Sequence, residues 1–248
     1  MGVLEFSHVS LTMPRTKRRQ GSGRKNRLRR LAGETSRTMV LVLQDVSFTV
    51  NRGESVGIIS SKPIARTSLI RLAAATLIPD SGSVTRAERV VPMIAIGRVM
   101  GPTFTIRQNA YLVGGLLGMS PEELTEKLPS IIEFAELGNH LDRHLRGAPP
   151  GARQRLAWSI AMAVEADVYA VDQTLVVGQL EFRRKCWSAV DTLRENGATF
   201  LVSADGAKEY RRFCDRGLFF DQGVLMADTT VSQALDLARG ARREPLGE

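Results

Sequence analysis

The sequence contains few of the residues that mark several common protein classes. It has only two cysteines, Cys186 and Cys214, which lie far apart and outside any metal-ligand spacing. This usage excludes a disulfide scaffold and favours a reducing compartment. No apolar run reaches the roughly 18 residues that a membrane span needs, and the N-terminus lacks the charged region and apolar stretch of a signal peptide. We therefore expect any membrane role of the chain to be peripheral.

The excess of positive charge is confined to one segment. Residues 15–37 carry ten basic side chains and one acidic side chain, whereas the remaining 225 residues carry 24 basic and 25 acidic ones. The formal net charge of +8 therefore belongs to a short stretch, which argues against a surface built to coat nucleic acid. Because the stretch is rich in Arg, Lys, Gly and Ser and poor in apolar residues, we expect a basic flexible insertion at residues 14–38.

The role of this insertion stays open between three interpretations. It is a solvated insertion, a contact with anionic lipid headgroups, or a contact with nucleic acid or an acidic partner. No aromatic residue interleaves its arginines, so a platform on which bases stack is not expected, and nucleic acid is the least favoured partner.

The pattern of apolar residues predicts one domain of the α/β class. A chain of 248 residues with 43% hydrophobic residues can bury a substantial core. Strands alternate with helices, which is typical of a parallel sheet whose ligands bind at the carboxyl ends of the strands. Strands are predicted at 3–11, 40–50, 55–59, 168–172 and 199–202, a closing hairpin at 218–226, and helices at 67–77, 121–135, 152–165 and 180–195. The strand ends that deserve inspection are therefore 60–67, 172–173 and 203–205.

Seven short segments occur in an order that is similar to ABC-transporter ATP-binding subunits. They are LQDVSF at 43–48, RGESVGII at 52–59, PDSG at 79–82, EFAELG at 133–138, VDQTLVVG at 171–178, FRRKC at 182–186 and FCDR at 213–216. Together they resemble the subfamily that energises export of capsular polysaccharide, O-antigen and teichoic acid. The resemblance runs from about residue 3 to residue 235. It implies a single P-loop NTPase-like ABC nucleotide-binding domain over residues 1–248, with a mixed or parallel sheet core, an antiparallel β edge and a helical subdomain at 106–165.

The segment at 60–67 has the length of a phosphate-binding loop but not its chemistry. Such a loop has the pattern G-x-x-x-x-G-K-[ST], in which backbone N–H groups and the Lys hold the phosphates and the hydroxyl binds Mg²⁺. Here both glycines are replaced, Pro63 has no N–H to donate, and an arginine stands in place of the lysine. An ordinary strand-to-helix turn is the alternative interpretation. The resemblance assigns nucleotide contacts to Ser60, Ala65, Arg66, Thr67 and Ser68, and an adenine contact to Met13.

The other motif positions of the family are also altered. Asp172 is retained and is expected to bind Mg²⁺ together with Thr67, unless it is only a structural acid at a strand end. The catalytic glutamate of the family is Gln173 here, which orients water but cannot take its proton. The switch histidine is Ala204. In the signature segment, Pro150 replaces the serine and Gly151 is kept.

These departures predict an impaired member of the family. Because losing one well-placed transition-state donor costs about 10²–10³ in rate, we expect a pseudo-ATPase that binds ATP and Mg²⁺ weakly at most. The resemblance implies a peripheral subunit at the cytoplasmic face of the inner membrane. Its partners would be a membrane permease and a second nucleotide-binding domain, in a homodimer or in a heterodimer with an intact paralogue. Two alternatives remain: an active ATPase with unusual motifs, and an interaction protein that binds anionic lipid or nucleic acid through its basic segment.

Overall fold

The computed structural model of the chain describes residues 2–14, 38–86, 89–94, 96–173 and 176–241. The strands are β1 Gly2–Pro14, β2 Met39–Asn51, β3 Ser55–Ser60, β4 Ser81–Arg86, β5 Val90–Met93, β6 Val168–Asp172, β7 Thr199–Ser203, β8 Arg216–Asp221 and β9 Val224–Thr230. The helices are α2 Pro63–Ala73, α3 Ile106–Leu116, α4 Pro121–Phe134, α5 Ala152–Ala163, α6 Leu180–Glu195, α7 Ala207–Phe213 and α8 Val231–Ala241, with 3₁₀ turns η1 Ile96–Val99, η2 Gly138–His140 and η3 Leu145–Gly147.

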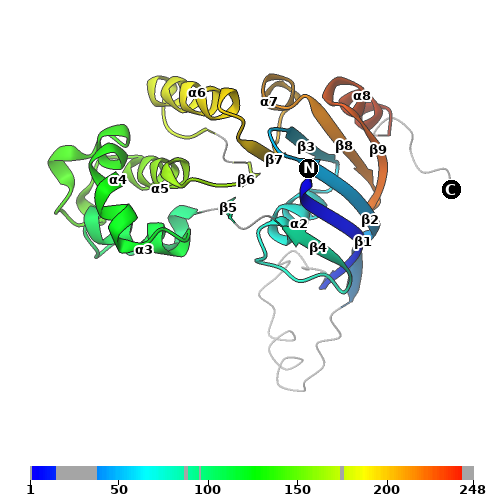
Figure 1. Ribbon diagram of the computed structural model, residues 1–248, viewed down its shortest axis with the longest axis horizontal. Helices are drawn as coiled ribbons and strands as arrows, with labels where there is room; N and C mark the ends of the chain where they lie inside the picture. Colours follow the sequence, from blue (N-terminus) through cyan, green and yellow to red (C-terminus); the bar gives the residue numbers. More distant parts are fainter. Residues whose placement is uncertain (1, 15–37, 87–88, 95, 174–175, 242–248) are drawn as a thin grey trace, which may run out of the picture.

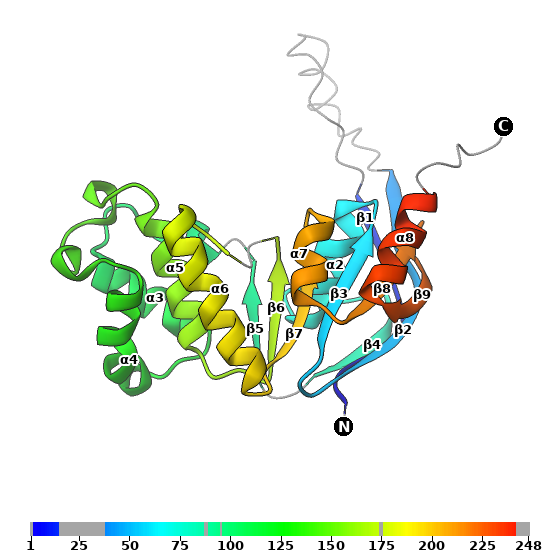
Figure 2. The same cartoon turned by 90° about the horizontal axis from the view of Figure 1, so that it is seen from above.

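Two sheets organise the fold. One has six strands in the order β5-β6-β7-β3-β8-β9, and only β9 runs antiparallel to its neighbour. The other is an antiparallel sheet of β2, β1 and β4, which lies across α2 from the first (Figures 1 and 2). Since β3, β6 and β7 are parallel, their carboxyl ends meet at one edge of the sheet. The predicted sheet core with an antiparallel edge is confirmed.

Each face of the six-stranded sheet covers a hydrophobic core of its own. The pleat turns successive side chains to opposite faces, so Ile58 joins the core shared with α2, β1 and β2, while Ile59 joins the core shared with α3 to α8. All six residues of β3 are buried, as expected for a central strand of a parallel sheet. At about 1.5–3 kcal/mol for each large apolar side chain, this two-sided burial fixes the strand ends in place.

Helices α3, α4 and α5 extend from the β5 edge of the sheet (Figure 1). Ser120 is the N-cap of α4, because its hydroxyl accepts a hydrogen bond from the backbone N–H of Glu123 at 3.1 Å. We refer to residues 96–163 as the helical region. That it forms a separate unit at 106–165 remains a prediction. The predicted basic insertion lies outside the described residues, apart from its end positions 14 and 38. No helix among the described residues has the length and apolar character needed to cross a membrane.

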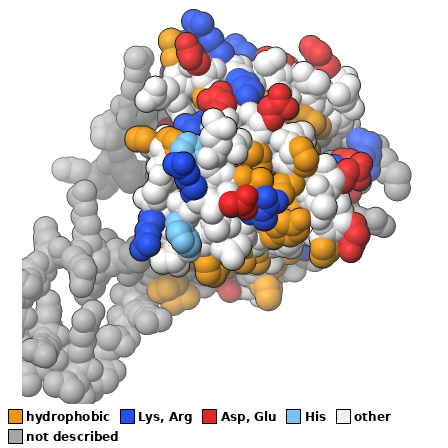
Figure 3. Space-filling view, turned by 90° about the vertical axis from the view of Figure 1, so that its left-hand side faces the viewer, with side chains coloured by type: hydrophobic (Ala, Val, Ile, Leu, Met, Phe, Trp, Pro, Cys, Tyr) orange, Lys and Arg blue, Asp and Glu red, His pale blue; other side chains and the backbone are white. Residues whose placement is uncertain are grey.

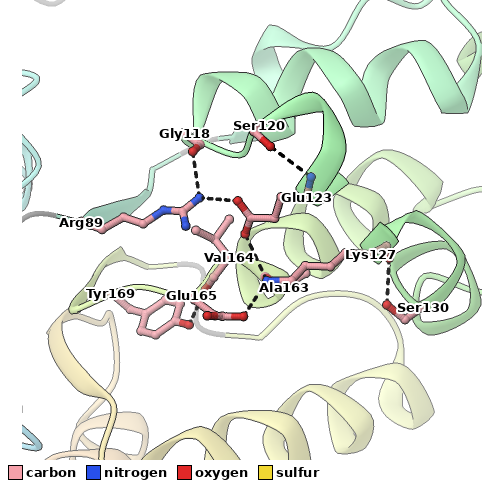
Figure 4. A network of polar contacts seen from close by, with 10 residues as sticks. All are labelled: Arg89, Gly118, Ser120, Glu123, Lys127, Ser130, Ala163, Val164, Glu165 and Tyr169. Carbon is pink, nitrogen blue, oxygen red and sulfur yellow. Dashed lines mark hydrogen bonds and ion pairs between the residues drawn. The ribbon is translucent and has the colours of Figure 1, made fainter. Parts of the chain in front are cut away.

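A polar network ties the helical region to the sheet (Figure 4). The Lys127 ammonium donates to Glu123 at 3.1 Å, to the Ala163 carbonyl at 3.1 Å and to Glu165 at 2.9 Å. Arg89, just before β5, donates to Glu123 at 3.3 Å. Burial alone would raise the pKa of Glu123, but the hydrogen bonds and charges of Lys127 and Arg89 outweigh it and lower that pKa. We call these five residues the Lys127 network.

One helix boundary differs from the prediction. The helix predicted at 67–77 begins at Pro63 and ends at Ala73. Proline suits the first position of a helix, because its fixed φ matches the helical value and the missing N–H has no intrahelical acceptor there. The early start places the whole segment 63–67 on a helix, so only Ser61 and Lys62 separate β3 from α2.

Candidate functional site

The connection between β3 and α2 is a tight turn that its own hydrogen bonds close. The backbone N–H of Lys62 donates to the Ser60 hydroxyl at 3.2 Å, and the N–H of Ala65 donates to the Lys62 carbonyl at 3.1 Å. Pro63 contributes no N–H. A phosphate-binding loop needs such donors to point outward at the ligand. The donors described here point into the turn instead.

Arg66 is buried and its guanidinium is engaged by the protein. It donates to the Ser60 carbonyl at 2.9 Å and to the Asp205 carboxylate at 3.0 Å. The Arg66 side chain is 9% exposed, whereas the Asp205 side chain is 72% exposed. Lys62, the other cation of the turn, donates to the side-chain oxygen of Gln222 in the β8–β9 turn. Both positive charges of the turn therefore have acceptors within the chain.

The structure brings Thr67 and Asp172 together, as the rule on strand ends predicted. The Thr67 hydroxyl donates to the Asp172 carboxylate at 2.9 Å. A hydroxyl and a carboxylate are oxygen ligands of the kind that Mg²⁺ takes. The same contact also serves a structural acid that joins β6 to α2. Among the described residues, no group of three or more His, Cys, Asp or Glu side chains could hold a metal ion.

Met13 and Ser68 also meet beside this turn. The Ser68 hydroxyl lies 3.5 Å from the Met13 sulfur; Ser68 is buried and Met13 is half-buried. Met13 thus lies near the end of β1 against α2, although the thioether is a small contact surface compared with an aromatic ring. Met13 in β1 and Ser68 in α2, which are both predicted to contact a nucleotide, are therefore neighbours.

The two predicted catalytic positions are held by backbone contacts. Gln173 is exposed, has φ 62°, and its N–H donates to the Ser203 carbonyl at 2.8 Å. Ala204 is buried, and its N–H donates to the Tyr210 hydroxyl at 2.9 Å. That hydroxyl in turn donates to the Ile58 carbonyl. Burial raises the pKa of Tyr210 to about 12, so the phenol stays neutral and keeps both contacts.

Sequence reasoning missed two residues of this site, Asp205 and Tyr210. Asp205 lies within the strand end 203–205 that was marked for inspection, but its pairing with Arg66 spans 139 positions. Tyr210 reaches the Ile58 carbonyl across 152 positions. Neither pairing leaves a local signal in the sequence.

The signature positions Pro150 and Gly151 lie in the helical region, whereas residues 60–67 belong to the sheet. Both are exposed, and Gly151 is the N-cap of α5 with φ 78°. A positive φ favours glycine, which gives Gly151 a structural reason to be retained. The Pro150 carbonyl accepts a hydrogen bond from Arg155 at 3.2 Å. Pro150 offers no hydroxyl at this exposed helix start.

The outer end of the helical region combines hydrophobic and charged side chains. Figure 3 shows this end of the molecule, where hydrophobic side chains gather among scattered charges. Among the residues of the region whose exposure is described, the exposed large hydrophobic ones are Val99, Phe104, Leu112 and Leu116, between 36% and 62% exposed. Clustered apolar surface of this kind is typical of protein interaction sites.

Comparison with curated proteins finds relatives in bacterial export systems. Two proteins of Klebsiella pneumoniae called O-antigen export system ATP-binding protein RfbB match most of the chain. One is 30% identical over 242 residues, covering 96% of this chain and 98% of that protein. The other is 31% identical over 201 residues, covering 81% and 82%. The ABC transporter protein AbcA of Aeromonas salmonicida is 34% identical over 184 residues, and this chain spans 60% of its length. No protein-family model matches the chain.

Solved structures share the fold. An ATP-binding subunit of an ABC transporter is 19% identical with a TM-score of 0.71, covering 98% of this chain and 96% of that one. A dimeric ATP-binding cassette in a post-hydrolysis state, bound to ADP and Pi, is 16% identical with a TM-score of 0.68, covering 92% and 98%. The predicted ABC nucleotide-binding fold is therefore confirmed.

Proposed function

This chain belongs to the ATP-binding proteins of ABC transporters that export O-antigen and teichoic acid, and we propose that it is a catalytically impaired subunit of such a polysaccharide exporter. It acts as a structural or regulatory partner of a permease and of an ATP-hydrolysing subunit. The observation that carries this proposal is that the buried Arg66 guanidinium already bonds to the Ser60 carbonyl and to the Asp205 carboxylate of its own chain.

The donor set of the turn does not fit a triphosphate in this arrangement. Three of its donors bond within the chain: Arg66 to Asp205, Lys62 to Gln222, and the N–H of Ala65 to a carbonyl of the turn. A nucleotide that uses these three donors must displace internal bonds, and a hydrogen bond to a charged group contributes about 1.5–3 kcal/mol. This cost supports weak binding at most.

The residues around the reacting water support impaired hydrolysis. Gln173 cannot accept a proton from water, and Ala204 presents only a methyl group. With base and switch both absent, the chain has no described group that would activate water. The separate losses need not multiply, because residues that act as a unit are not additive. Even so, we expect hydrolysis by this chain to fall to background.

A second candidate, weak binding of a nucleotide with Mg²⁺, is favoured by one contact. The hydrogen bond between Thr67 and Asp172 keeps together the two oxygen ligands that the family uses. When bound, Mg²⁺ would supply charge neutralisation for phosphate oxygens. An active export ATPase is the extreme form of this alternative.

The assembly that we propose is supported by family membership. The chain pairs with itself or with an intact paralogue, and it sits peripherally at the cytoplasmic face of the inner membrane against a permease. The exposed hydrophobic residues of the helical region, such as Phe104 and Leu116, are the contact that we assign to the permease. The basic insertion is a contact for anionic lipid rather than for nucleic acid.

A copurification experiment tests the permease contact. Leu116→Glu should abolish copurification with a co-expressed permease, whereas Ile78→Glu, at a more exposed site outside the helical region, should not. Equal effects of the two variants would contradict this docking face.

ATP turnover by the purified chain tests the impaired chemistry. We expect phosphate release with Mg-ATP to equal that of buffer. The alternative of an active enzyme predicts a rate that Asp172→Asn and Thr67→Ala abolish. A rate that survives in both variants belongs to a contaminating ATPase. Glu126→Gln, on the exposed surface of α4, is the matched control, because it should leave a genuine rate unchanged.

A further inference from the structure

A small cavity is lined by Arg66, a residue that also carries an unused donor. The cavity has a volume of about 130 Å³, which is room for a small ion. Its charged lining residues are Arg66, Asp205 and Arg239. The Arg66 Nε atom is buried and has no hydrogen-bond partner among the described residues. A nine-tenths buried cation with an unfilled donor is the chemistry that binds an oxyanion.

We propose that this cavity is an oxyanion site that the carboxylate of Asp205 occupies as an internal competitor. The inference rests on the proposed function, because a chain that held a triphosphate here would have to release Arg66 from Asp205. Asp205 follows directly after the buried Ala204, at the end of β7. Its side chain is 72% exposed, and the ion pair with Arg66 is its one polar side-chain contact within the described part of the chain.

Arg66 stays in position when Asp205 leaves. Its second hydrogen bond goes to the Ser60 carbonyl at 2.9 Å, which is backbone of a fully buried strand. The guanidinium is therefore held at the cavity independently of the carboxylate. Removing Asp205 changes the charged lining from two cations and one anion to two cations, since Arg239 also lines the cavity. A phosphate, sulfate or terminal nucleotide phosphate then finds a preformed arginine.

The experiment compares phosphate binding to the full chain and to two alanine variants. Inorganic phosphate is titrated by calorimetry into the unaltered chain, Asp205→Ala and Asp142→Ala. Asp142 is the matched control, because it also pairs with an arginine and its side chain is also 72% exposed, but its partner Arg107 is 44% exposed. Phosphate should bind Asp205→Ala at least about tenfold more tightly than the unaltered chain. Asp142→Ala should equal the unaltered chain.

Three results would overturn the proposal: no gain in Asp205→Ala, an equal gain in Asp142→Ala, or a gain that survives in the double variant Asp205→Ala, Arg66→Gln. If the double variant does not fold, a crystal structure of Asp205→Ala grown with phosphate decides. An anion within hydrogen-bond distance of Arg66 supports the site, and an anion elsewhere or none overturns it.

The source of the oxyanion is resolved by a parallel titration with ADP. A gain for ADP that matches or exceeds the gain for phosphate means that the site accepts a nucleotide's terminal phosphate, and a gain for phosphate alone means a free oxyanion. Both support the site, and no gain for either overturns it. Turnover of ATP by the unaltered chain would overturn the proposed function, whereas a missing gain in Asp205→Ala overturns only the competitor role of Asp205.

Discussion

The Lys127 network and the Arg66–Asp205 pair both hold a cation against carboxylates, yet they differ in how completely it is satisfied. The Lys127 side chain is 24% exposed, and its ammonium has three acceptors that include two carboxylates. The Arg66 side chain is 9% exposed, and its guanidinium has a single carboxylate that is mostly in solvent and one donor without an acceptor among the described residues. A saturated network of this kind stabilises the fold, whereas a buried cation with an unfilled donor marks a place where a ligand fits.

The largest predicted loss of stability comes from removing the Tyr210 hydroxyl, an uncharged group whose contact with Ala204 adjoins Asp205 in the sequence. Tyr210→Phe removes the hydroxyl that accepts from the buried N–H of Ala204 and donates to the carbonyl of the buried residue Ile58. At about 1–3 kcal/mol for each unsatisfied group, the free energy of unfolding should fall by about 3 kcal/mol in urea denaturation. Tyr111→Phe is the control, because the Tyr111 hydroxyl bonds to Thr125 in an exposed setting, and its loss should be well under half as large. Equal losses would mean that the strand ends do not depend on Tyr210.

Lys127→Met should lower the free energy of unfolding by a smaller amount, about 2 kcal/mol. Its three acceptors lose one shared donor, and Glu123, with 25% of its side chain exposed, keeps Arg89 as its ion-pair partner among the residues that the structure describes. Lys208→Met, at an exposed lysine of α7, should change stability by less than about 0.5 kcal/mol. If the two variants behave alike in denaturant unfolding, the network is not the structural tie that we describe.

The smallest effect is a pH dependence of the same network. The pKa of Glu123 lies below its ordinary value of 4.5 in the folded chain. Its contribution to stability is therefore complete above pH 4.5 and is lost as the pH falls through the lowered pKa. Glu123→Gln should flatten the acid side of the stability curve relative to Glu126→Gln on the same helix. Identical acid slopes for both variants would remove Glu123 from the account.

Much of the fold was predictable because its central strands are buried on both faces. The continuous apolar runs at 55–59, 168–172 and 199–202 lie within β3, β6 and β7. Strand β4 was missed because its residues are exposed or half-buried and its strand geometry comes from pairing with β1. Strand β5 was missed because it has four residues and contains Pro92, which an edge strand tolerates. Helices α7 and α8 were also missed; α7 has only seven residues.

The contacts of the candidate site that follow from the order of parallel strands were predictable. The contacts between side chains that are distant in the sequence were not. Parallel strand ends meet at one edge, which brought Thr67 and Asp172 into contact as expected. The ion-pair partner of Arg66 was not predictable, because Asp205 lies 139 positions away in the sequence. Replacing a lysine by an arginine at position 66 changes reach and donor geometry, and only coordinates show which acceptor it finds.

The central claim is that Lys62 and Arg66, at the turn after β3, bond to groups of their own chain and not to a nucleotide. The most direct measurement is a crystal structure of the full chain grown with excess Mg²⁺ and a non-hydrolysable ATP analogue. We expect the hydrogen bonds of Arg66 to Asp205 and to the Ser60 carbonyl to persist, with no triphosphate on the turn. A triphosphate held by residues 60–67, with Arg66 released from Asp205 and turned onto the phosphates, would contradict the account.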